Sequence, residues 1–515
     1  MMDFHNRAQA RLSEGRAPAT ALAAFSGGAR IGQSLAGIVD GRGSVPETTT
    51  AFRIASCTKS FTAAAILLLR DRGQLSLDDD AREYLSTLKI MGCMNGPENP
   101  VMTLHMLLSM CSGLPTDDPW ADRQESMSHG DFEDLMSHGV RLVRSPGSAY
   151  EYSNLGYAML GKVVERVSGV GYRRFIEREF LEPLKLNGTA FSKETMLAQM
   201  ADRTSSATTI ATGYRKNTRG NTAPIPDQQP YNWEELPTTG PGAFSAIGGL
   251  FSTLDDMGRW AAWLQEAFHD EHATGSTVAS AGPLCRETRR EMQDMHQVSE
   301  PADVDGTVNG YGYGLVVQHH GLYGTVIGHS GGYPGFSAHM RWHPGTGNIV
   351  VGFENATYSK VGVAVRALLE ERLARKMVGA GAASQRAVQR QEVLELTASA
   401  VAVPEPIVSW PETIQAMAAV EELVRSPGST LGNEVFSPNV VQDMPWEERR
   451  AAMEAALAVV GPLADSADER TPPRWETAAS VEWDLPARGG DLRIRVKMTP
   501  VDPPRVQLLE ISPRT

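Results

Sequence analysis

The sequence has few cysteines, no long apolar run and a deficit of positive charge. Cys57, Cys93, Cys111 and Cys285 are the four cysteines in 515 residues. No Cys-x-x-Cys pair occurs, so the sequence indicates neither a zinc knuckle nor a thioredoxin motif and requires no disulfide framework. No apolar run reaches about 18 residues, so we expect no membrane-spanning helix. The net charge of −13 argues against nucleic acid or an anionic membrane surface as the main partner.

The N-terminus, MMDFHNRAQARLSEG, lacks the order of charged, apolar and small residues that marks a secretory signal. Together with the few thiols, this leads us to expect a cytoplasmic protein. A content of 41% hydrophobic and 21% charged residues is typical of a globular chain, and the length favours two domains. We expect no cofactor and no metal site.

Hydrophobic periodicity and glycine stops predict an α+β fold. Strands from both ends of the main region would form one antiparallel sheet, with helices beside it and an all-helical region between. We expect a hairpin over residues 19–43 and three or four antiparallel strands over 311–356. We expect helices over 58–72, 103–113, 154–169, 171–184, 252–268 and 361–377.

A Gly/Ala-rich break at residues 378–385 divides the chain. We predict a main domain over 1–377, a linker with a helix over 378–404, and a small α+β domain over 405–515. Two helices that begin near prolines and three strands are expected in the small domain, which faintly resembles cystatin-like or NTF2-like folds. This small domain is expected to cover a cleft, to set substrate size or to form a dimer.

A hydroxyl and an ammonium lie three residues apart where a long apolar helix is expected to begin. Ser56-Cys57-Thr58-Lys59 precedes FTAAAILLL, and positions i and i+3 share a helix face. A serine needs a neighbouring base to become a nucleophile, and burial favours the neutral lysine that can act as this base. The pattern indicates either a Ser56 nucleophile with a Lys59 base, or a helix cap with a solvated lysine.

Two further motifs follow. Tyr152-Ser153-Asn154 lies before an expected helix, where a phenol can relay protons and an amide can hold a lysine and a substrate carbonyl. The alternative interpretation is a simple N-cap at Asn154 with tyrosines in the core. His329-Ser330-Gly331-Gly332 follows an expected strand, and its glycine pair permits close approach of a substrate backbone.

Several copies of these patterns carry no function in our interpretation. Ser86-Thr87-Leu88-Lys89 repeats the S-x-x-K spacing by chance, without an apolar helix behind it. His-x-Gly recurs at His319 and His343, and we expect His319-His320 to lie in a polar turn. Cys57 is expected to be a small packing residue, not a nucleophile.

In this order, S-x-x-K, Y-x-N and H-x-G-G resemble the motifs of the serine β-lactamase and D-Ala-D-Ala carboxypeptidase-like hydrolases. The branch with Tyr in the second motif includes class C β-lactamases, D-alanyl-D-alanine carboxypeptidases, D-aminopeptidases and β-lactamase-like esterases. The phrases FRIASCTKSFTAAAILLL, LLSMCSGLP and GGLFSTLDDMGRW support the resemblance, which covers about residues 15–377.

The resemblance implies a β-lactamase-like catalytic domain that forms an acyl-enzyme on Ser56. Lys59 and Tyr152 would exchange protons, and the N–H groups of Ser56 and Gly332 would form the oxyanion hole. The residues that would orient the substrate are Asn154, His329, Ser330 and Gly331.

His329 stands where class C β-lactamases carry lysine. This favours a peptidase, amidase or esterase acting on D-amino-acid-type substrates or small esters. The alternative is a β-lactam-binding protein or a weak β-lactamase with little turnover. An imidazole with a pKa near 6.5 is mostly neutral at pH 7.5. His329 is also expected to hydrogen-bond Tyr152, so that activity falls as the pH drops and the imidazole charges.

The loop PTDDPWADRQ at 115–124 carries acids that are expected either to bind a substrate's free amine or to be solvated. These are Asp117, Asp118 and Asp122, with Trp120 as a substrate contact or packed inward. The expected partner is a small-molecule or short-peptide substrate, not nucleic acid or a membrane. The sequence is also compatible with a homodimer.

Overall fold

The computed structural model describes residues 4–93, 96–201, 209–216, 232–269, 282–303, 306–380, 407–426, 434–464 and 471–514. The chain divides into two compact units. The first comprises Met1–Asp79, Leu107–Ser109 and Tyr157–Val401, and the second comprises Asp80–Met106, Met110–Gly156 and Ala402–Thr515. Among the described residues, no helix is long and apolar enough to cross a bilayer.

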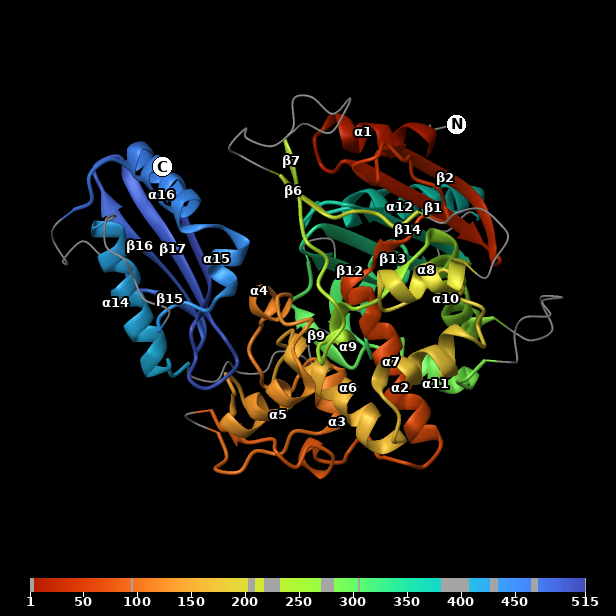
Figure 1. Ribbon diagram of the computed structural model, residues 1–515, viewed down its shortest axis with the longest axis horizontal. Helices are drawn as coiled ribbons and strands as arrows, with labels where there is room; N and C mark the ends of the chain where they lie inside the picture. Colours follow the sequence, from red (N-terminus) through yellow and green to blue (C-terminus); the bar gives the residue numbers. More distant parts are fainter. Residues whose placement is uncertain are drawn as a thin grey trace. The chain divides into compact units, whose positions relative to one another are not determined.

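The first unit is built on an eight-stranded antiparallel sheet in the order β2-β1-β14-β13-β12-β11-β10-β9 (Figure 1). Gly27 and Gly28 form the two-residue turn of the first hairpin and both have positive φ, as such hairpin turns require. The strands are β1 (Ala19–Ser26), β2 (Ala29–Gly37), β9 (Gln297–Glu300), β10 (Val308–Tyr311), β11 (Val316–His320), β12 (Gly324–Tyr333), β13 (Phe336–His343) and β14 (Asn348–Glu354).

Helices cover both faces of this sheet (Figure 1). Leu22 and Val350 pack with Val365 and Leu369 of α12 (Gly362–Ala380) on one face. On the other face, α10 (Leu254–Gln265) approaches so closely that a Cβ on Gly258 would lie 2.4 Å from the ring of Phe25. All residues of β14 are buried as a result, which explains its nearly continuous apolar sequence.

The helix α2 (Lys59–Asp71) lies in the core of the first unit. Its residues from Lys59 through Leu69 are all buried, so it is covered on every side. The ring of Phe61 stacks on that of Trp260 with centroids 3.9 Å apart, and Trp260 Nε1 donates a hydrogen bond to Ser60 Oγ. The first residue of α2 is therefore held by a tightly packed helix.

The remaining elements of the first unit are short. They include two small antiparallel pairs, β3 with β8 and β6 with β7. The elements are η1 (Phe4–Asn6), α1 (Arg7–Ser13), β3 (Phe52–Arg53), η2 (Ala55–Thr58), α7 (Tyr172–Ile176), η4 (Glu177–Leu181), α8 (Lys193–Ala201), β6 (Tyr214–Lys216), β7 (Trp233–Glu235), α9 (Ser245–Gly248), β8 (Phe251–Ser252), η5 (Glu266–Phe268) and α11 (Arg286–Glu291).

The second unit joins a mostly helical segment to the C-terminal residues. Two helices, α3 (Leu104–Leu108) and α6 (Asn154–Ser168), begin in this unit and continue into the first. The helical segment has η3 (Ala81–Glu83), β4 (Ile90–Met91), α4 (Asp118–Ala121), α5 (His129–His138) and β5 (Val140–Arg141). The C-terminal residues form α14 (Pro411–Arg425), α15 (Asn439–Asp443), α16 (Trp446–Val460), β15 (Arg474–Thr477), β16 (Ser480–Ala487), β17 (Gly490–Met498) and β18 (Val506–Arg514).

The C-terminal sheet has the order β15-β16-β17-β18 and its own apolar core. Arg141 of the helical segment binds Glu412 with both terminal nitrogens, at 2.9 and 3.0 Å, and Asp502 through Nε at 2.7 Å. Val143 packs against the same core. The C-terminal residues are thus attached to the helical segment through charged and apolar contacts.

The predicted α+β fold and small C-terminal sheet domain are confirmed. Other expectations were wrong in detail. The expected helix at 103–113 ends at Leu108, and Met110 has a left-handed φ of 61°. The first of the three strands expected in the small domain, over residues 475–485, is a tight hairpin instead, so the C-terminal sheet has four strands.

His319 and His320 end strand β11 and do not lie in a turn. The antiparallel pairing of β11 with β12 continues through His319↔Thr325 and His320↔Gly324, and the His319 side chain also forms a hydrogen bond with Thr325. The predicted domain boundaries and the cystatin-like or NTF2-like character stay predictions. Most of the predicted linker, from residue 381 on, lies outside the described residues.

Candidate active site

The turn η2 presents Ser56 at the start of α2. The residue before it, Ala55, has a φ of 47°, a left-handed conformation that is strained for a residue with a Cβ and is often found at functional sites. Ser56 is partly exposed, whereas its neighbours Ala55 and Cys57 are buried. The turn therefore exposes one hydroxyl within an otherwise buried segment.

Lys59 is the first residue of α2 and its side chain returns to the serine. Lys59 Nζ lies 3.0 Å from Ser56 Oγ and donates a hydrogen bond to it. The same nitrogen donates to the carbonyl oxygen of Ile247, also at 3.0 Å, and lies 5.7 Å from the ring centre of Tyr157. Lys59 has no exposed surface, so the predicted pairing of hydroxyl and amine is present and the solvated-lysine alternative is wrong.

The strand β12 carries the third motif against the same turn. A Cβ on Gly331 would lie 2.3 Å from the carbonyl oxygen of Ile54 and 3.1 Å from the Cβ of Ala55. Only glycine permits this approach. Because β11 pairs with β12 no further than Gly328, the segment Ser330–Gly332 pairs, among the strands that the structure describes, with β13 alone. The motif thus lies beside the turn that presents Ser56.

His329 is buried next to this turn. Its Nε2 lies 2.9 Å from Tyr311 Oη and its Nδ1 lies 2.5 Å from the carbonyl oxygen of Ser330. Burial, reinforced by the positive charge of Lys59, lowers the pKa of His329 to about 3. The expectation of an unperturbed pKa near 6.5 was wrong, because a buried cation beside another cation is strongly disfavoured.

Cys57 behaves as a packing residue. Its thiol is buried and donates to the carbonyl oxygen of His329 at 3.4 Å. Burial raises the pKa of Cys57 to about 12, so the nucleophilic thiolate is absent at neutral pH. Ser86 and Lys89, the second S-x-x-K copy, lie in exposed positions outside any helix, in agreement with the interpretation of chance.

The second motif belongs to the second unit. The buried Asp117 accepts hydrogen bonds from the backbone N–H of Asn154 at 2.7 Å and of Leu155 at 2.9 Å. These are N–H groups of the first turn of α6, which need an external acceptor. Asn154 was expected to be either a simple N-cap or a functional amide, and the structure instead gives the capping task to Asp117, which is therefore not free to bind a substrate amine.

The side chain of Asn154 is held by the same loop. Its Nδ2 donates to Asp118 Oδ1 at 2.7 Å. Trp120, in α4, is 6% exposed, so its ring is packed inward. Roles for Asp118, Trp120 and Tyr152 in substrate binding or proton transfer stay predictions.

The predicted site residues thus fall into two sets. Ser56 and Lys59 are brought together with the His329–Gly332 strand in the first unit. Tyr152 and Asn154 belong to the second unit with Asp118 and Trp120. Sequence reasoning missed Tyr311 and Ile247, which bond His329 and Lys59, because no local pattern marks a residue that becomes a partner only after folding.

A family model described as Beta-lactamase matches residues 4–374. The chain belongs to the Beta-lactamase family. Members of the Beta-lactamase family are generally serine hydrolases, and this agrees with a serine and a lysine paired at the start of a buried helix. The predicted family resemblance is confirmed.

Curated relatives match part of the chain. Protein flp of Staphylococcus aureus (strain N315) is 34% identical over 147 residues, which cover 28% of this chain and 29% of that protein. Beta-lactamase-like protein 4 of Dictyostelium discoideum is 29% identical over 218 residues, covering 40% of this chain and 34% of that protein. The matches therefore span about a third of these relatives' lengths.

Solved structures share the Beta-lactamase family fold. An octameric penicillin-binding protein homologue from Pyrococcus abyssi has a TM-score of 0.55 at 19% identity and covers 98% of both chains. A D-stereospecific amidohydrolase from Streptomyces sp. has a TM-score of 0.50 at 23% identity, over 69% of this chain and 95% of that one. The first similarity extends the shared fold to the C-terminal sheet.

Proposed function

We propose that this protein is a serine hydrolase that works through an acyl-enzyme on Ser56. Its substrates would be amides or peptides of the D-amino-acid type, or small carboxylic esters. The observation that carries this proposal is the 3.0 Å hydrogen bond between buried Lys59 Nζ and Ser56 Oγ. Family membership supports the hydrolase class, and the D-stereospecific amidohydrolase neighbour supports the substrate type.

In the proposed reaction, neutral Lys59 takes the proton of Ser56 as Oγ attacks the substrate carbonyl carbon. The new C–O bond forms while an electron pair moves to the carbonyl oxygen, and the N–H groups of Ser56 and Gly332 stabilise this oxyanion. The tetrahedral intermediate then breaks its bond to the leaving amine or alcohol, which receives a proton through Lys59 and Tyr152.

Water completes the cycle. It loses a proton to the same groups and attacks the acyl-enzyme carbonyl, the bond to Ser56 Oγ breaks, and the serine regains its proton. The close approach of Gly331 to the turn before Ser56 supports Gly332 as an oxyanion donor, because it places this strand beside the nucleophile. Removing one such donor usually costs about 2.7–4 kcal/mol of transition-state stabilisation.

The uncharged His329 in the third motif supports amides and esters, in preference to β-lactams, as the substrates. A lysine there would offer a permanent positive charge to a β-lactam carboxylate, whereas burial keeps His329 uncharged. We therefore propose D-aminopeptidase-like or esterase-like activity. We also propose a cytoplasmic location, on the sequence alone.

A substrate panel tests the proposal. The full chain is incubated with p-nitrophenyl esters, with D- and L-aminoacyl p-nitroanilides and with nitrocefin, and acyl adducts are located by peptide mass mapping. We expect turnover of an ester or of a D-aminoacyl anilide, with the adduct on Ser56. No turnover of any compound, together with no adduct, would contradict the proposal.

A further inference from the structure

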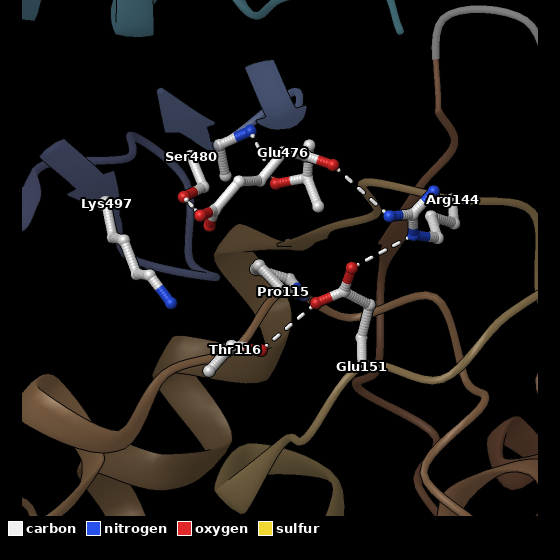
Figure 2. A pocket seen from close by; sticks show the side chains of 9 residues that line it. Pro115, Thr116, Arg144, Glu151, Glu476, Ser480 and Lys497 are labelled. Carbon is white, nitrogen blue, oxygen red and sulfur yellow. Dashed lines mark hydrogen bonds and ion pairs between the residues drawn. The ribbon is translucent and has the colours of Figure 1, made fainter. Parts of the chain in front are cut away.

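A pocket of about 110 Å³ in the second unit has a wall whose charges are already matched (Figure 2). Two cations, Arg144 and Lys497, and two carboxylates, Glu151 and Glu476, line it. Glu151 accepts hydrogen bonds from Arg144 at 2.9 Å and from the hydroxyl of Thr116 at 3.0 Å. The described residues of this wall therefore carry no excess charge for a ligand.

In the first unit, Tyr358 exposes an aromatic side chain from a strained backbone. Tyr358 is 48% exposed, and its φ of 45° is left-handed, which costs free energy for a residue with a Cβ. Lys360, two residues further along, is also left-handed, with a φ of 62°. Strain of this kind persists only where the surrounding structure imposes it, and it is often found at functional sites.

One side chain of β13 fastens this segment on both sides of Tyr358. The hydroxyl of Ser337 accepts a hydrogen bond from the N–H of Ser359 at 2.7 Å and donates to the carbonyl oxygen of Ala356 at 3.1 Å. In the antiparallel pairing of β12 with β13, Ser337 lies directly opposite Gly332. The hydrogen bonds of Ser337 thus hold Tyr358 next to the third motif.

The ring of Tyr358 lies against the backbone of Gly332. A Cβ on Gly332 would lie 2.5 Å from both Cδ1 and Cε1 of this ring, so only a residue without a side chain fits beneath it. Gly332 is also the residue whose N–H is the oxyanion donor in the reaction given above. A half-exposed aromatic ring therefore lies beside the place that the scissile carbonyl would occupy.

We propose that Tyr358 determines substrate specificity by holding an apolar or aromatic substituent on the carbon next to the scissile carbonyl. This inference rests on the proposed function. A carbonyl oxygen bound at the N–H of Gly332 brings the neighbouring carbon and its substituent close to the ring. A benzyl group would cover the exposed part of the ring and remove both apolar surfaces from water, whereas a methyl group is too small to do so.

The test is the ratio of kcat/KM for a substrate with a benzyl substituent to kcat/KM for its methyl counterpart. The pairs are p-nitrophenyl phenylacetate with p-nitrophenyl acetate, and D-phenylalanyl with D-alanyl p-nitroanilide; every pair that the parent chain turns over is used. We expect Tyr358→Ala to lower this ratio about tenfold, because the benzyl group loses an apolar contact. Tyr358→Phe keeps the ring and should retain the parental ratio.

Two further variants complete the design. Leu322→Ala removes a 42% exposed apolar side chain from the β11–β12 turn, at the opposite end of β12 from Gly332, and should leave the ratio unchanged. Tyr358→Gly removes the ring and adopts a φ of 45° without strain. It covers the case in which Tyr358→Ala does not fold, and it should show the same lowered ratio.

A parental ratio in the folded Tyr358→Ala or Tyr358→Gly variant would overturn the proposal and leave the ring with a structural role. A lowered ratio in Tyr358→Phe would also overturn it, because the hydroxyl and not the ring would then be responsible. The two proposals fail in different ways. If the parent shows neither turnover nor a Ser56 adduct, the hydrolase function fails and this inference fails with it, whereas turnover with an unchanged ratio contradicts this inference alone.

Discussion

The side-chain amide of Gln507, on the last strand of the C-terminal sheet, donates a hydrogen bond to the carbonyl oxygen of Thr116 at 3.1 Å. Its oxygen accepts a hydrogen bond from the N–H of Trp120 at 3.2 Å. The loop between these two contacts contains Asp117, which holds the N–H of Asn154. A residue near the C-terminus thus positions the loop that supports the second motif.

We predict that Gln507→Leu destabilises the second unit and slows acylation. Gln507 is 1% exposed, so its removal leaves buried backbone groups unsatisfied, at about 1–3 kcal/mol. Thermal unfolding measures the stability of the variant. The rate of fluorophosphonate labelling, taken at a temperature where the variant is fully folded, shows whether displacement of the Tyr152–Asn154 motif slows acylation. The control Gln442→Leu, at an exposed position of α15, should change neither the unfolding temperature nor the labelling rate. If Gln507→Leu also labels at the parental rate, Gln507 has a purely structural role.

Ser56→Ala is expected to abolish labelling by a fluorophosphonate probe. The reason is that Ser56 is the serine paired with a buried lysine. Ser86→Ala alters the same motif in an exposed turn and should leave labelling intact. Gel fluorescence of the labelled chains makes the comparison, and labelling that persists without Ser56 would show that another residue is the nucleophile.

Lys59→Ala and Tyr152→Phe should each lower kcat by about 10²–10⁴, the range for general acid–base groups. If both serve one proton relay, the double variant should lose little more than the worse single variant. Steady-state kinetics with the best substrate of the panel test this. Losses that multiply in the double variant would indicate separate tasks.

The lowered pKa of His329 should make the stability of the protein depend on pH. Its pKa is lowered to about 3 in the folded protein, against about 6.5 in the unfolded chain. Between these values only the unfolded state binds the proton, so the stability is fully present above about pH 6.5. It falls with decreasing pH by up to about 1.4 kcal/mol per pH unit until about pH 3.

His329→Gln should flatten part of this slope in urea unfolding measured from pH 7 to pH 4. A remaining slope is expected from His339, which is also buried and whose pKa burial lowers well below its ordinary value. His138→Gln, in an exposed position, should leave the slope unchanged. An unaltered slope in His329→Gln would show that this imidazole is not held neutral.

We predict that nitrocefin is turned over slowly or not at all. The uncharged His329 offers no full positive charge to the β-lactam carboxylate, whereas esters and aminoacyl amides do not need one. The measurement is kcat/KM for nitrocefin against the best ester or D-aminoacyl amide. A value for nitrocefin that matches or exceeds the others would establish a β-lactamase instead.

Local patterns predicted the elements that present the site. Apolar periodicity ended by Gly73 located α2, and the Gly27-Gly28 pair located the first hairpin. The length of a helix was harder to predict. The helix expected at 103–113 ends early, before a left-handed Met110, because packing and not the identity of one methionine sets the backbone conformation there.

The sequence by itself determined the reactive pair, since Ser56 and Lys59 lie three residues apart and any helix beginning there places them on one face. Only the tertiary structure decided the state of His329, because its pKa depends on burial and on Lys59, 270 positions away in the chain. The sequence also could not predict that Asp117 caps α6 or that Gln507 bonds Thr116, since hydrogen bonds between distant segments exist only after the chain has folded. The spacing of residues in the sequence determines which neighbouring side chains share a helix face. The burial of a side chain and its contacts with distant segments arise only in the packed fold.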